Sequence, residues 1–386
     1  MIDWQPRALA LADQLTDSGE LRGKAWREAF GVVPRHMFVP RFHTATGEVV
    51  DGTNAADTER WLDEVYADTV LITQTRQVGN GPVLPTSSST MPGIMAWMLE
   101  ALDVQDGHRV LEVGTGTGYN AALLSHRLGD HNVASVDLDP DLVSAAGARL
   151  AQLGYRPTLV AGDGADGVPG DTFDRIVCTA AVDHVPPAWI EQLTPGGRIV
   201  TDMRGPIGGA LATLTLTDHG VVEGRFSSYR AAFMPLRPKL DDPAGPGNFS
   251  LPVTIDTRDG HQSSTTINPA DEVFSDRAFR FFLQLHLAGT GVGGFTPTEG
   301  DPYMLAANTS GAWLMVSTSP DDDGTYRVQQ GGGVRVWDTV EAAHQLWSPL
   351  DKPAIDRFGV SATTEPHAQY VWLDASDGHL SWPLPL

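Results

Sequence analysis

The chain has 386 residues, of which 41% are hydrophobic, so it can bury a sizeable core, and its length favours two domains. Its 48 acidic and 26 basic side chains give a formal net charge of -22, which repels nucleic acid and anionic membrane surfaces. The single cysteine, Cys178, excludes an internal disulfide or a cysteine-based zinc site and fits a reducing compartment. The first residues lack a basic start with an apolar stretch, and no segment offers about 20 consecutive apolar residues. We therefore expect a cytoplasmic protein, with no membrane partner, no nucleic-acid partner and no metal site.

The N-terminal third contains three helical patterns separated by polar sequence. Apolar residues recur at helical spacing in 7–19 and 24–34, which predicts two short helices. Residues 41–85 are rich in Thr, Asp, Gly and Asn and are predicted to be loops. The polar run PTSSSTMPG then leads into a helical pattern at 94–102, with Thr90 as a candidate N-cap.

Between residues 110 and 236, short apolar runs alternate with helical patterns. This alternation predicts a parallel sheet with helices on both faces, because parallel strands need crossover connections. The period-two pattern around His219 and Gly220 predicts that the sheet ends in an antiparallel hairpin. The fold class is therefore α/β, with a doubly wound, mostly parallel, Rossmann-like sheet.

The remaining residues are predicted to form a smaller C-terminal α+β domain. Residues 234–252 are dense in proline and glycine and are interpreted as a linker or domain boundary. Helices are predicted at 275–289 and 340–347, and short strands are predicted at 312–318, 326–330, 334–338 and 370–374. We divide the chain into N-terminal helices and substrate-side loops (1–90), a cofactor-binding core (91–236) and a C-terminal extension (237–386). The extension is a candidate peptide-recognition module, although its tryptophans also suit a core.

A glycine-rich turn, GTGTG, follows the first predicted strand of the core. A dinucleotide-binding turn would carry a glycine where this chain has Tyr119. Acidic residues lie before the turn and after the next strand, and a GDG sequence follows the strand after that. Each feature alone has a structural explanation, as a tight turn or a solvated carboxylate, but their order on consecutive strand–helix units favours S-adenosylmethionine as the cofactor. The candidate cofactor-binding residues are Glu112, Gly114, Thr115, Gly116, Gly118, Asp137, Leu138, Gly162, Asp163 and Gly164.

Several longer motifs together resemble the protein-L-isoaspartate O-methyltransferase family. They are VPRHMFVP at 33–40, YADTVL at 66–71, RVLEVGTGTGYNAALL at 109–124, GDG at 162–164 and FDRIVCTAAVDHVPPAWIEQLTPGGRIV at 173–200. The resemblance covers roughly the first 235 residues. It implies methyl transfer from S-adenosylmethionine to an aspartate or isoaspartate carboxylate in a peptide, giving an ester that collapses to a succinimide.

The acceptor chemistry needs orientation rather than a base. An aspartate with a pKa of about 3.9 is already ionised at neutral pH, so its methylation requires a positioned, partly desolvated carboxylate. The hydroxyl run, residues 86–90, can donate hydrogen bonds to such a group, and the candidate catalytic residues are Ser88, Ser89 and Thr90. The alternative is a polar loop with a helix cap and no substrate contact.

Two departures from the family pattern concern the substrate. Thr90, Met91, Pro92 and Gly93 stand where the family carries a Ser-x-Pro-His motif, and Gly93 is expected to leave room for a bulkier acceptor. Members of the family usually end soon after the catalytic sheet, whereas this chain continues. The extended chain resembles members of the family that act on ribosomal precursor peptides of the lanthipeptide type. The alternatives are repair of isoaspartate in damaged proteins and a binding protein without catalytic activity.

Four further residues have two interpretations each. Arg35 and His36 either lie near the site or belong to a structural salt bridge. Cys178 is interpreted as a packing residue, and His184 is interpreted as a surface-loop residue rather than a contact of the cofactor or substrate.

Overall fold

The predicted alternation of strands and helices produces a parallel sheet in the computed structural model, which describes residues 3–77, 83–240, 260–296, 301–308, 310–365 and 367–384. Its parallel strands pair in the order β7-β6-β5-β8-β9. The strands are β5 (Val110–Val113), β6 (Val133–Asp137), β7 (Thr158–Ala161), β8 (Phe173–Val182) and β9 (Leu193–Arg204). The hairpin predicted at the end of the sheet is confirmed, because β10 (Gly209–Leu216) pairs antiparallel with β9 and with β11 (Val222–Phe226).

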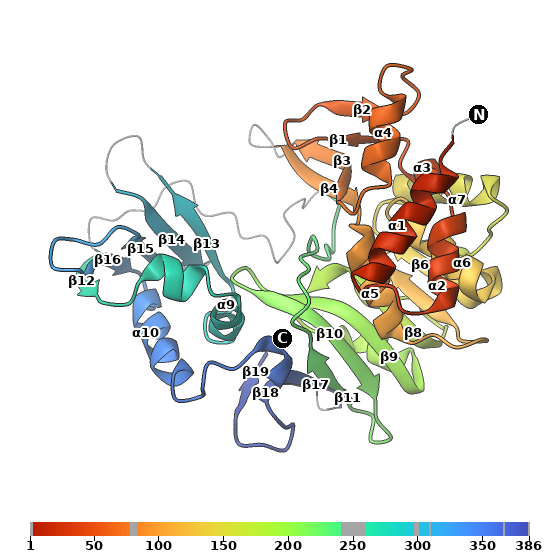
Figure 1. Ribbon diagram of the computed structural model, residues 1–386. Helices are drawn as coiled ribbons and strands as arrows, with labels where there is room; N and C mark the ends of the chain where they lie inside the picture. The colour runs from red at the N-terminus through yellow and green to blue at the C-terminus, as the bar shows by residue number, and fades with distance from the viewer. Residues whose placement is uncertain are drawn as a thin grey trace.

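Helices cover both faces of this sheet (Figure 1). Successive strand residues belong to different hydrophobic clusters: Val110 packs with the N-terminal helices, and Leu111 packs with the opposite cluster. This doubly wound arrangement confirms the predicted α/β, Rossmann-like class. The sheet as a whole is mixed rather than mostly parallel, because antiparallel strands extend it beyond β9. The helices of the core and the N-terminus are α1 (Gln5–Asp17), α2 (Lys24–Val32), α3 (Arg35–Phe38), α5 (Pro92–Leu102), α6 (Tyr119–Leu128), α7 (Pro140–Gln152) and α8 (Pro187–Glu191).

The prediction of loops over residues 41–85 is wrong. These residues form helix α4 (Thr58–Val65) and most of a four-stranded sheet of order β2-β1-β3-β4, with β1 (Arg41–His43), β2 (Val49–Asp51), β3 (Leu71–Gln77) and β4 (Val83–Ser89). Most of the residues of β3 are polar and half-buried, so the strand carries no alternation of apolar and polar residues. Backbone pairing with β4 therefore forms it without a local signal in the sequence.

The described part of the predicted linker, residues 234–240, begins with a segment bound to the core. The backbone N–H of Ala181 donates to the Met234 carbonyl at 2.8 Å, and the N–H of Leu236 donates to the Ala181 carbonyl at 2.7 Å. The interpretation as a linker is therefore wrong for residues 234–236, and the interpretation as a domain boundary stays a prediction. Residues 241–252 of the predicted linker lie outside the described residues.

The C-terminal region contains an antiparallel five-stranded sheet of order β12-β16-β15-β14-β13. Its elements are β12 (His261–Thr265), a π-helical turn (Pro269–Phe274), α9 (Arg277–Gln284), β13 (Thr290–Phe295), β14 (Tyr303–Asn308), β15 (Trp313–Ser317), β16 (Tyr326–Gly331) and α10 (Val336–Trp347). The strands predicted near 312–318 and 326–330 and both helices are confirmed. The strand predicted at 334–338 is wrong, because helix α10 begins at Val336 and buries Val340, Ala343 and Trp347 at helical spacing.

The chain then returns to the main sheet. Strands β17 (Phe358–Thr364), β18 (His367–Leu373) and β19 (Ser381–Pro383) extend it beyond β11, so that it has ten strands. Strand β18 includes the strand predicted at 370–374. The Gln369 side-chain amide also donates to the Val185 carbonyl at 2.7 Å and accepts from the Val185 N–H at 2.9 Å. The division of the chain at residue 236 stays a prediction, and the main sheet draws its strands from both sides of that position.

Candidate active site

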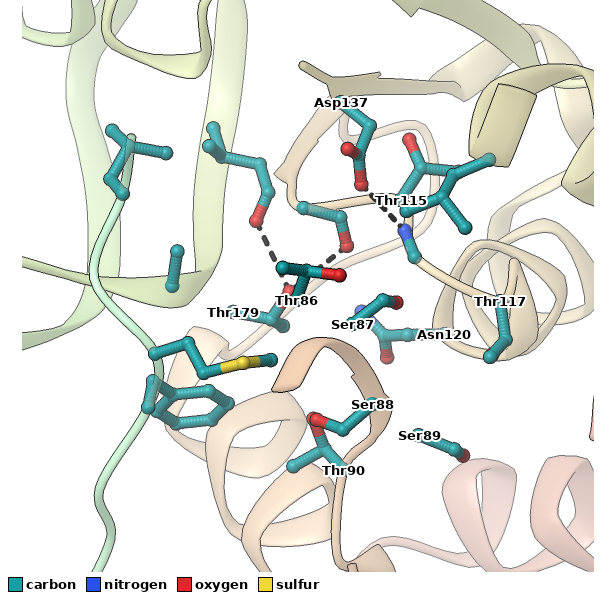
Figure 2. Close-up of a pocket in the computed structure, with 18 of the residues that line it drawn as sticks. Thr86, Ser87, Ser88, Ser89, Thr90, Thr115, Thr117, Asn120, Asp137 and Thr179 are labelled. Carbon is teal, nitrogen blue, oxygen red and sulfur yellow. Dashed lines mark hydrogen bonds between the residues drawn. The ribbon is translucent and has the colours of Figure 1, made fainter. Parts of the chain in front are cut away.

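A cavity of about 410 Å³ opens at the carboxyl ends of β5, β6 and β8. Ligands of open α/β sheets bind at this edge. Three segments supply most of its wall: the glycine-rich turn, the end of β4 with the hydroxyl run, and residues 232–237, which follow β11 (Figure 2). The cavity therefore lies between the predicted cofactor turn and the predicted acceptor side.

The glycine-rich turn has the conformation that only glycine adopts without strain. Gly114, Gly116 and Gly118 have φ angles of +100°, +50° and +89°. Gly114, Thr115 and Gly116 line the cavity. Gly118 does not, and it is instead the N-cap of α6, where an added Cβ would lie 3.0 Å from the Ala146 Cβ. Its position indicates a packing requirement rather than direct contact with a ligand.

Asp137, at the end of β6, faces the cavity beside this turn (Figure 2). One carboxylate oxygen accepts from the Gly116 N–H at 2.8 Å, and the other accepts from the Asp139 N–H at 3.1 Å. Burial raises the pKa of the carboxyl above its ordinary value, while both hydrogen bonds oppose that change. Each oxygen keeps acceptor capacity for a hydroxyl group in the cavity. The neighbouring Leu138 also lines the cavity.

Glu112 is fully buried below the turn. Its carboxylate accepts from Asn120 Nδ2 at 2.8 Å and from Ser135 Oγ at 2.6 Å, and Ser135 Oγ is 2.6 Å from Thr115 Oγ1. Burial raises the pKa of Glu112 to about 7. No described residue donates to the buried Oδ1 of Asn120, which lines the same cavity. An acidic network and an unsatisfied acceptor suit a ligand with a cationic group, such as the ammonium of S-adenosylmethionine.

The GDG sequence is divided between two sites. Gly164 lines the main cavity, where an added Cβ would lie 2.5 Å from Val113 and 3.0 Å from Leu236. Gly162 lines neither cavity, and its N–H donates to the Asp137 carbonyl at 2.9 Å. Asp163 accepts from the Ala165 N–H at 2.9 Å and lines a neighbouring cavity of about 180 Å³. Asp163, predicted as a cofactor-binding residue, therefore lines the neighbouring cavity rather than the main one.

The hydroxyl run follows the alternation of a strand. In Figure 2 the side chains of Ser88 and Thr90 lie together, and that of Ser89 extends away from them. Thr86 Oγ1 donates to Gln74 Oε1 at 2.7 Å, and Ser89 Oγ accepts from Arg35. All the residues of the run line the cavity, and Ser87 Oγ accepts from Thr73 Oγ1 at 3.3 Å. The hydroxyls of Ser88 and Thr90 form no hydrogen bond with a described residue, so they are the most suitably placed to meet an acceptor.

Two sequence-based interpretations next to this run are wrong. The N-cap of α5 is Met91, not Thr90, and the Asp68 carboxylate accepts from the Gly93 N–H at 2.7 Å. Gly93 does not create an open space either, because an added Cβ would lie 2.8 Å from Asp68 Oδ2. A carboxylate at a helix N-terminus is favourable, and this one occupies the volume that a larger side chain at position 93 would need.

The 232–237 segment was not identified as part of the site from the sequence. The Phe233 N–H donates to Asp202 at 3.0 Å, and Arg237 Nη2 donates to the Thr86 carbonyl at 3.2 Å. Phe233, Met234, Leu236 and Arg237 line the cavity. The segment has no apolar periodicity that could have predicted this position.

Cys178 and His184 take no direct part in the main cavity. Cys178 is buried in the core, and burial raises the pKa of its thiol to about 12, so it remains protonated. His184 lies 2.6 Å from the Asp183 carboxylate, which raises the pKa of the imidazole, and it lines the smaller cavity.

Comparison with known proteins identifies the family. Residues 43–210 match the family model of protein-L-isoaspartate(D-aspartate) O-methyltransferases. Protein-L-isoaspartate O-methyltransferase 2 of Archaeoglobus fulgidus is 33% identical over 243 residues, which are 61% of this chain and 95% of that protein. The chain belongs to the protein-L-isoaspartate O-methyltransferase family. It is therefore a carboxyl methyltransferase that depends on S-adenosylmethionine.

Other members of the family show how far the similarity extends. The protein-L-isoaspartate O-methyltransferase of Anaeromyxobacter dehalogenans is 41% identical over 170 residues, 42% of this chain and 74% of that relative. A solved structure with the same name has a TM-score of 0.52 and 19% identity, and the match covers 95% of this chain and 99% of the other. This fold similarity includes C-terminal residues, so a chain that continues past the catalytic sheet does not by itself distinguish this protein from that enzyme.

None of the described helices has the length and apolar character needed to span a membrane.

Proposed function

We propose that this methyltransferase acts on an aspartate or isoaspartate carboxylate in a peptide, held by Ser88 and Thr90 beside the glycine-rich turn. The observation that carries the proposal is the single cavity that joins these hydroxyls to the turn and to Asp137. The acceptor side and the cofactor side thus share one space, as a direct transfer requires.

The cofactor side has suitable donors and acceptors. Asp137 would accept from the ribose hydroxyls, backbone groups of Gly114 and Gly116 would contact the methionine part, and Glu112 with Asn120 would face its ammonium. When bound, S-adenosylmethionine supplies an electrophilic methyl group. These assignments rest on the acceptors and close backbone approach in the cavity wall.

The acceptor side would bind an anion that needs no deprotonation. The hydroxyls of Ser88 and Thr90 would donate to one carboxylate oxygen and leave the other directed at the methyl group. The 232–237 segment would exclude water from this end, since Phe233 and Met234 form part of its wall. Orientation and desolvation are thus the contributions of the protein.

For the physiological substrate we propose a ribosomally synthesised precursor peptide of the lanthipeptide type. Methylation would convert one of its aspartates to a succinimide or isoaspartate. The supporting observation is that part of the acceptor wall, residues 232–237, lies beyond the residues that match the family model. Side chains in this part of the wall that differ from those of other family members would suit a different substrate. The second candidate is repair of isoaspartate in damaged proteins, which the fold similarity to a solved protein-L-isoaspartate O-methyltransferase favours.

One assay separates the two substrates. The enzyme is incubated with an isoaspartyl hexapeptide and, separately, with an aspartate-containing precursor peptide of the lanthipeptide type, and methyl incorporation is measured by mass spectrometry. We expect methylation of the precursor peptide at a single aspartate. Efficient turnover of the isoaspartyl hexapeptide with none of the precursor would support repair instead.

The acceptor assignment has its own test. The Ser88→Ala, Thr90→Ala double variant should raise the KM for the peptide about tenfold or more, because each lost hydrogen bond to a charged group weakens binding. Its affinity for S-adenosylhomocysteine should stay unchanged. Thr73→Ala, on the neighbouring strand β3, is the control, because Thr73 does not line the cavity. A double variant with unaltered peptide kinetics would place the acceptor elsewhere.

A further inference from the structure

Arg35 is a buried cation whose hydrogen bonds end on neutral oxygens. Its side chain is 0% exposed. Nη1 donates to the carbonyls of Val65 at 2.7 Å and Ala67 at 3.2 Å, and Nη2 donates to the Thr69 carbonyl at 3.3 Å. It forms no ion pair with any residue that the structure describes, so the structural salt bridge considered from the sequence is absent there. Burial lowers its pKa to about 10, which leaves it protonated at neutral pH.

The same guanidinium holds the end of β4, which carries the acceptor hydroxyls. Nη2 donates to Ser89 Oγ at 3.2 Å and to the Thr90 carbonyl at 3.0 Å. Because side chains alternate along a strand, holding Ser89 on one side directs Ser88 and Thr90 to the other (Figure 2). The guanidinium carbon also lies 5.9 Å from the ring centroid of Tyr119, the first residue of α6, which lines the cavity.

A buried charge is costly unless another charge or several dipoles compensate it. Around Arg35 the compensation comes from carbonyl dipoles and one hydroxyl. The carboxylate of Asp68, which acts on Arg35 electrostatically, accepts a hydrogen bond from the Gly93 N–H instead. The positive charge is therefore only partly neutralised in the enzyme itself. An anion beside Ser88 and Thr90 would complete the compensation.

We propose that Arg35 is a positioning residue for the acceptor carboxylate. It acts through Ser89 and Thr90 and does not touch the substrate: its hydrogen bonds orient the hydroxyls, and its charge makes this end of the cavity prefer an anion over a neutral group of the same shape. The inference rests on the proposed placement of the acceptor at Ser88 and Thr90.

The test compares binding of a charged peptide with binding of a neutral one. An isoaspartyl hexapeptide and its carboxamide analogue are titrated into the enzyme saturated with S-adenosylhomocysteine. The wild-type enzyme should bind the carboxylate peptide at least about tenfold more tightly. In Arg35→Met, most of this difference in affinity between the carboxylate and carboxamide peptides should disappear. Arg35→Lys should keep most of the difference but have a lower kcat, because lysine retains the charge but not the forked hydrogen bonds.

Arg175 provides the matched control. It is 9% exposed, its Nε donates to the carbonyls of Leu102 at 2.8 Å and Asp103 at 3.2 Å, and it does not line the cavity. Arg175→Met removes a similar buried guanidinium and should leave the carboxylate preference unchanged. A loss of preference equal to that of Arg35→Met would indicate a general structural effect and overturn the proposal.

Three other results would overturn it. They are a wild-type enzyme that binds both peptides equally, an Arg35→Met variant that keeps the full ratio, and an Arg35→Lys variant that loses all of it. The wild-type and lysine measurements decide the matter even if Arg35→Met does not fold. The two proposals can fail separately. If the Ser88→Ala, Thr90→Ala variant has altered peptide kinetics but Arg35→Met keeps the wild-type affinity ratio, the role of Arg35 is rejected and the acceptor assignment still holds.

Discussion

Glu112 allows a quantitative test of the electrostatics below the glycine-rich turn. Its pKa rises from 4.5 to about 7 because the carboxyl is fully buried. At about 1.4 kcal/mol per pKa unit, this corresponds to roughly 3 kcal/mol. The folded protein binds the proton more tightly than the unfolded chain, so the stabilisation is complete below about pH 4.5 and is lost as the pH rises through about 7.

The replacement Glu112→Gln removes this titration while keeping the hydrogen bonds. Gln Oε1 would accept from Asn120, and Gln Nε2 would donate to Ser135, whose hydroxyl can turn to Thr115. Between about pH 5 and pH 8 the stability of the variant relative to wild type should therefore increase by roughly 2.5 kcal/mol.

Urea unfolding of the cofactor-free proteins at several pH values, followed by tryptophan fluorescence, measures this difference. Glu191→Gln, the same replacement at an exposed position of α8, is the control. A Glu112→Gln curve that runs parallel to the wild-type curve across this range would refute the reasoning. It would show that the carboxyl is ionised in the folded protein without a stability cost.

Three other substitutions test single contacts. Asp137→Ala should weaken S-adenosylhomocysteine binding about tenfold to a hundredfold in calorimetry, and unchanged affinity would contradict the ribose assignment. Gly93→Ala should lower the free energy of unfolding by about 1–2 kcal/mol, because its Cβ displaces the Asp68 carboxylate from the helix terminus. If the losses of stability caused by Gly93→Ala and Asp68→Ala add fully in the double variant, as measured by thermal melts, the two side chains do not clash. Gln369→Leu should destabilise the protein by about 2–4 kcal/mol because it leaves both backbone groups of Val185 buried and unpaired, and an unchanged melting temperature would contradict that role.

The core of the fold could be predicted from the sequence because its signals are local. Each strand of the parallel sheet is a short apolar run followed by a helical pattern, and the hairpin after β10 has its turn at Gly220. Pairings between distant segments had no such signal. Strands β3 and β4 form from polar residues, and β17 pairs with β11 across a long stretch of sequence. Helix α10 was assigned partly to a strand because Val334 and Val336 alternate with Arg335.

The site shows the same division between local and distant information. The spacing along the chain was sufficient to predict that Gly114, Gly116 and Asp137 share one cavity wall, since successive parallel strands end at the same edge of the sheet. Asn120 lies within the 109–124 motif, but neither it nor Ser135 was identified from the sequence as a partner of Glu112. Residues 234–237 were assigned to a linker or domain boundary because proline-rich composition is typical of linkers, whereas here the backbone pairs with β8. The roles of the lining residues stay predictions until the variants are measured.

The return of β17 to β11 has a consequence for how the enzyme matures. Arg225 on β11 donates to the Arg357 carbonyl, 132 positions further along the chain, and residues of β17 and β18 share one hydrophobic cluster with the cofactor-side strands. Contacts between such distant residues form late, because the intervening chain must first be closed into a loop. During synthesis, the edge of strand β11 therefore stays unpaired until more than a hundred further residues have left the ribosome. We expect a chain that is released before β17 has been synthesised to aggregate or be degraded rather than to methylate its peptide. Activity would then depend on translation of the full-length chain.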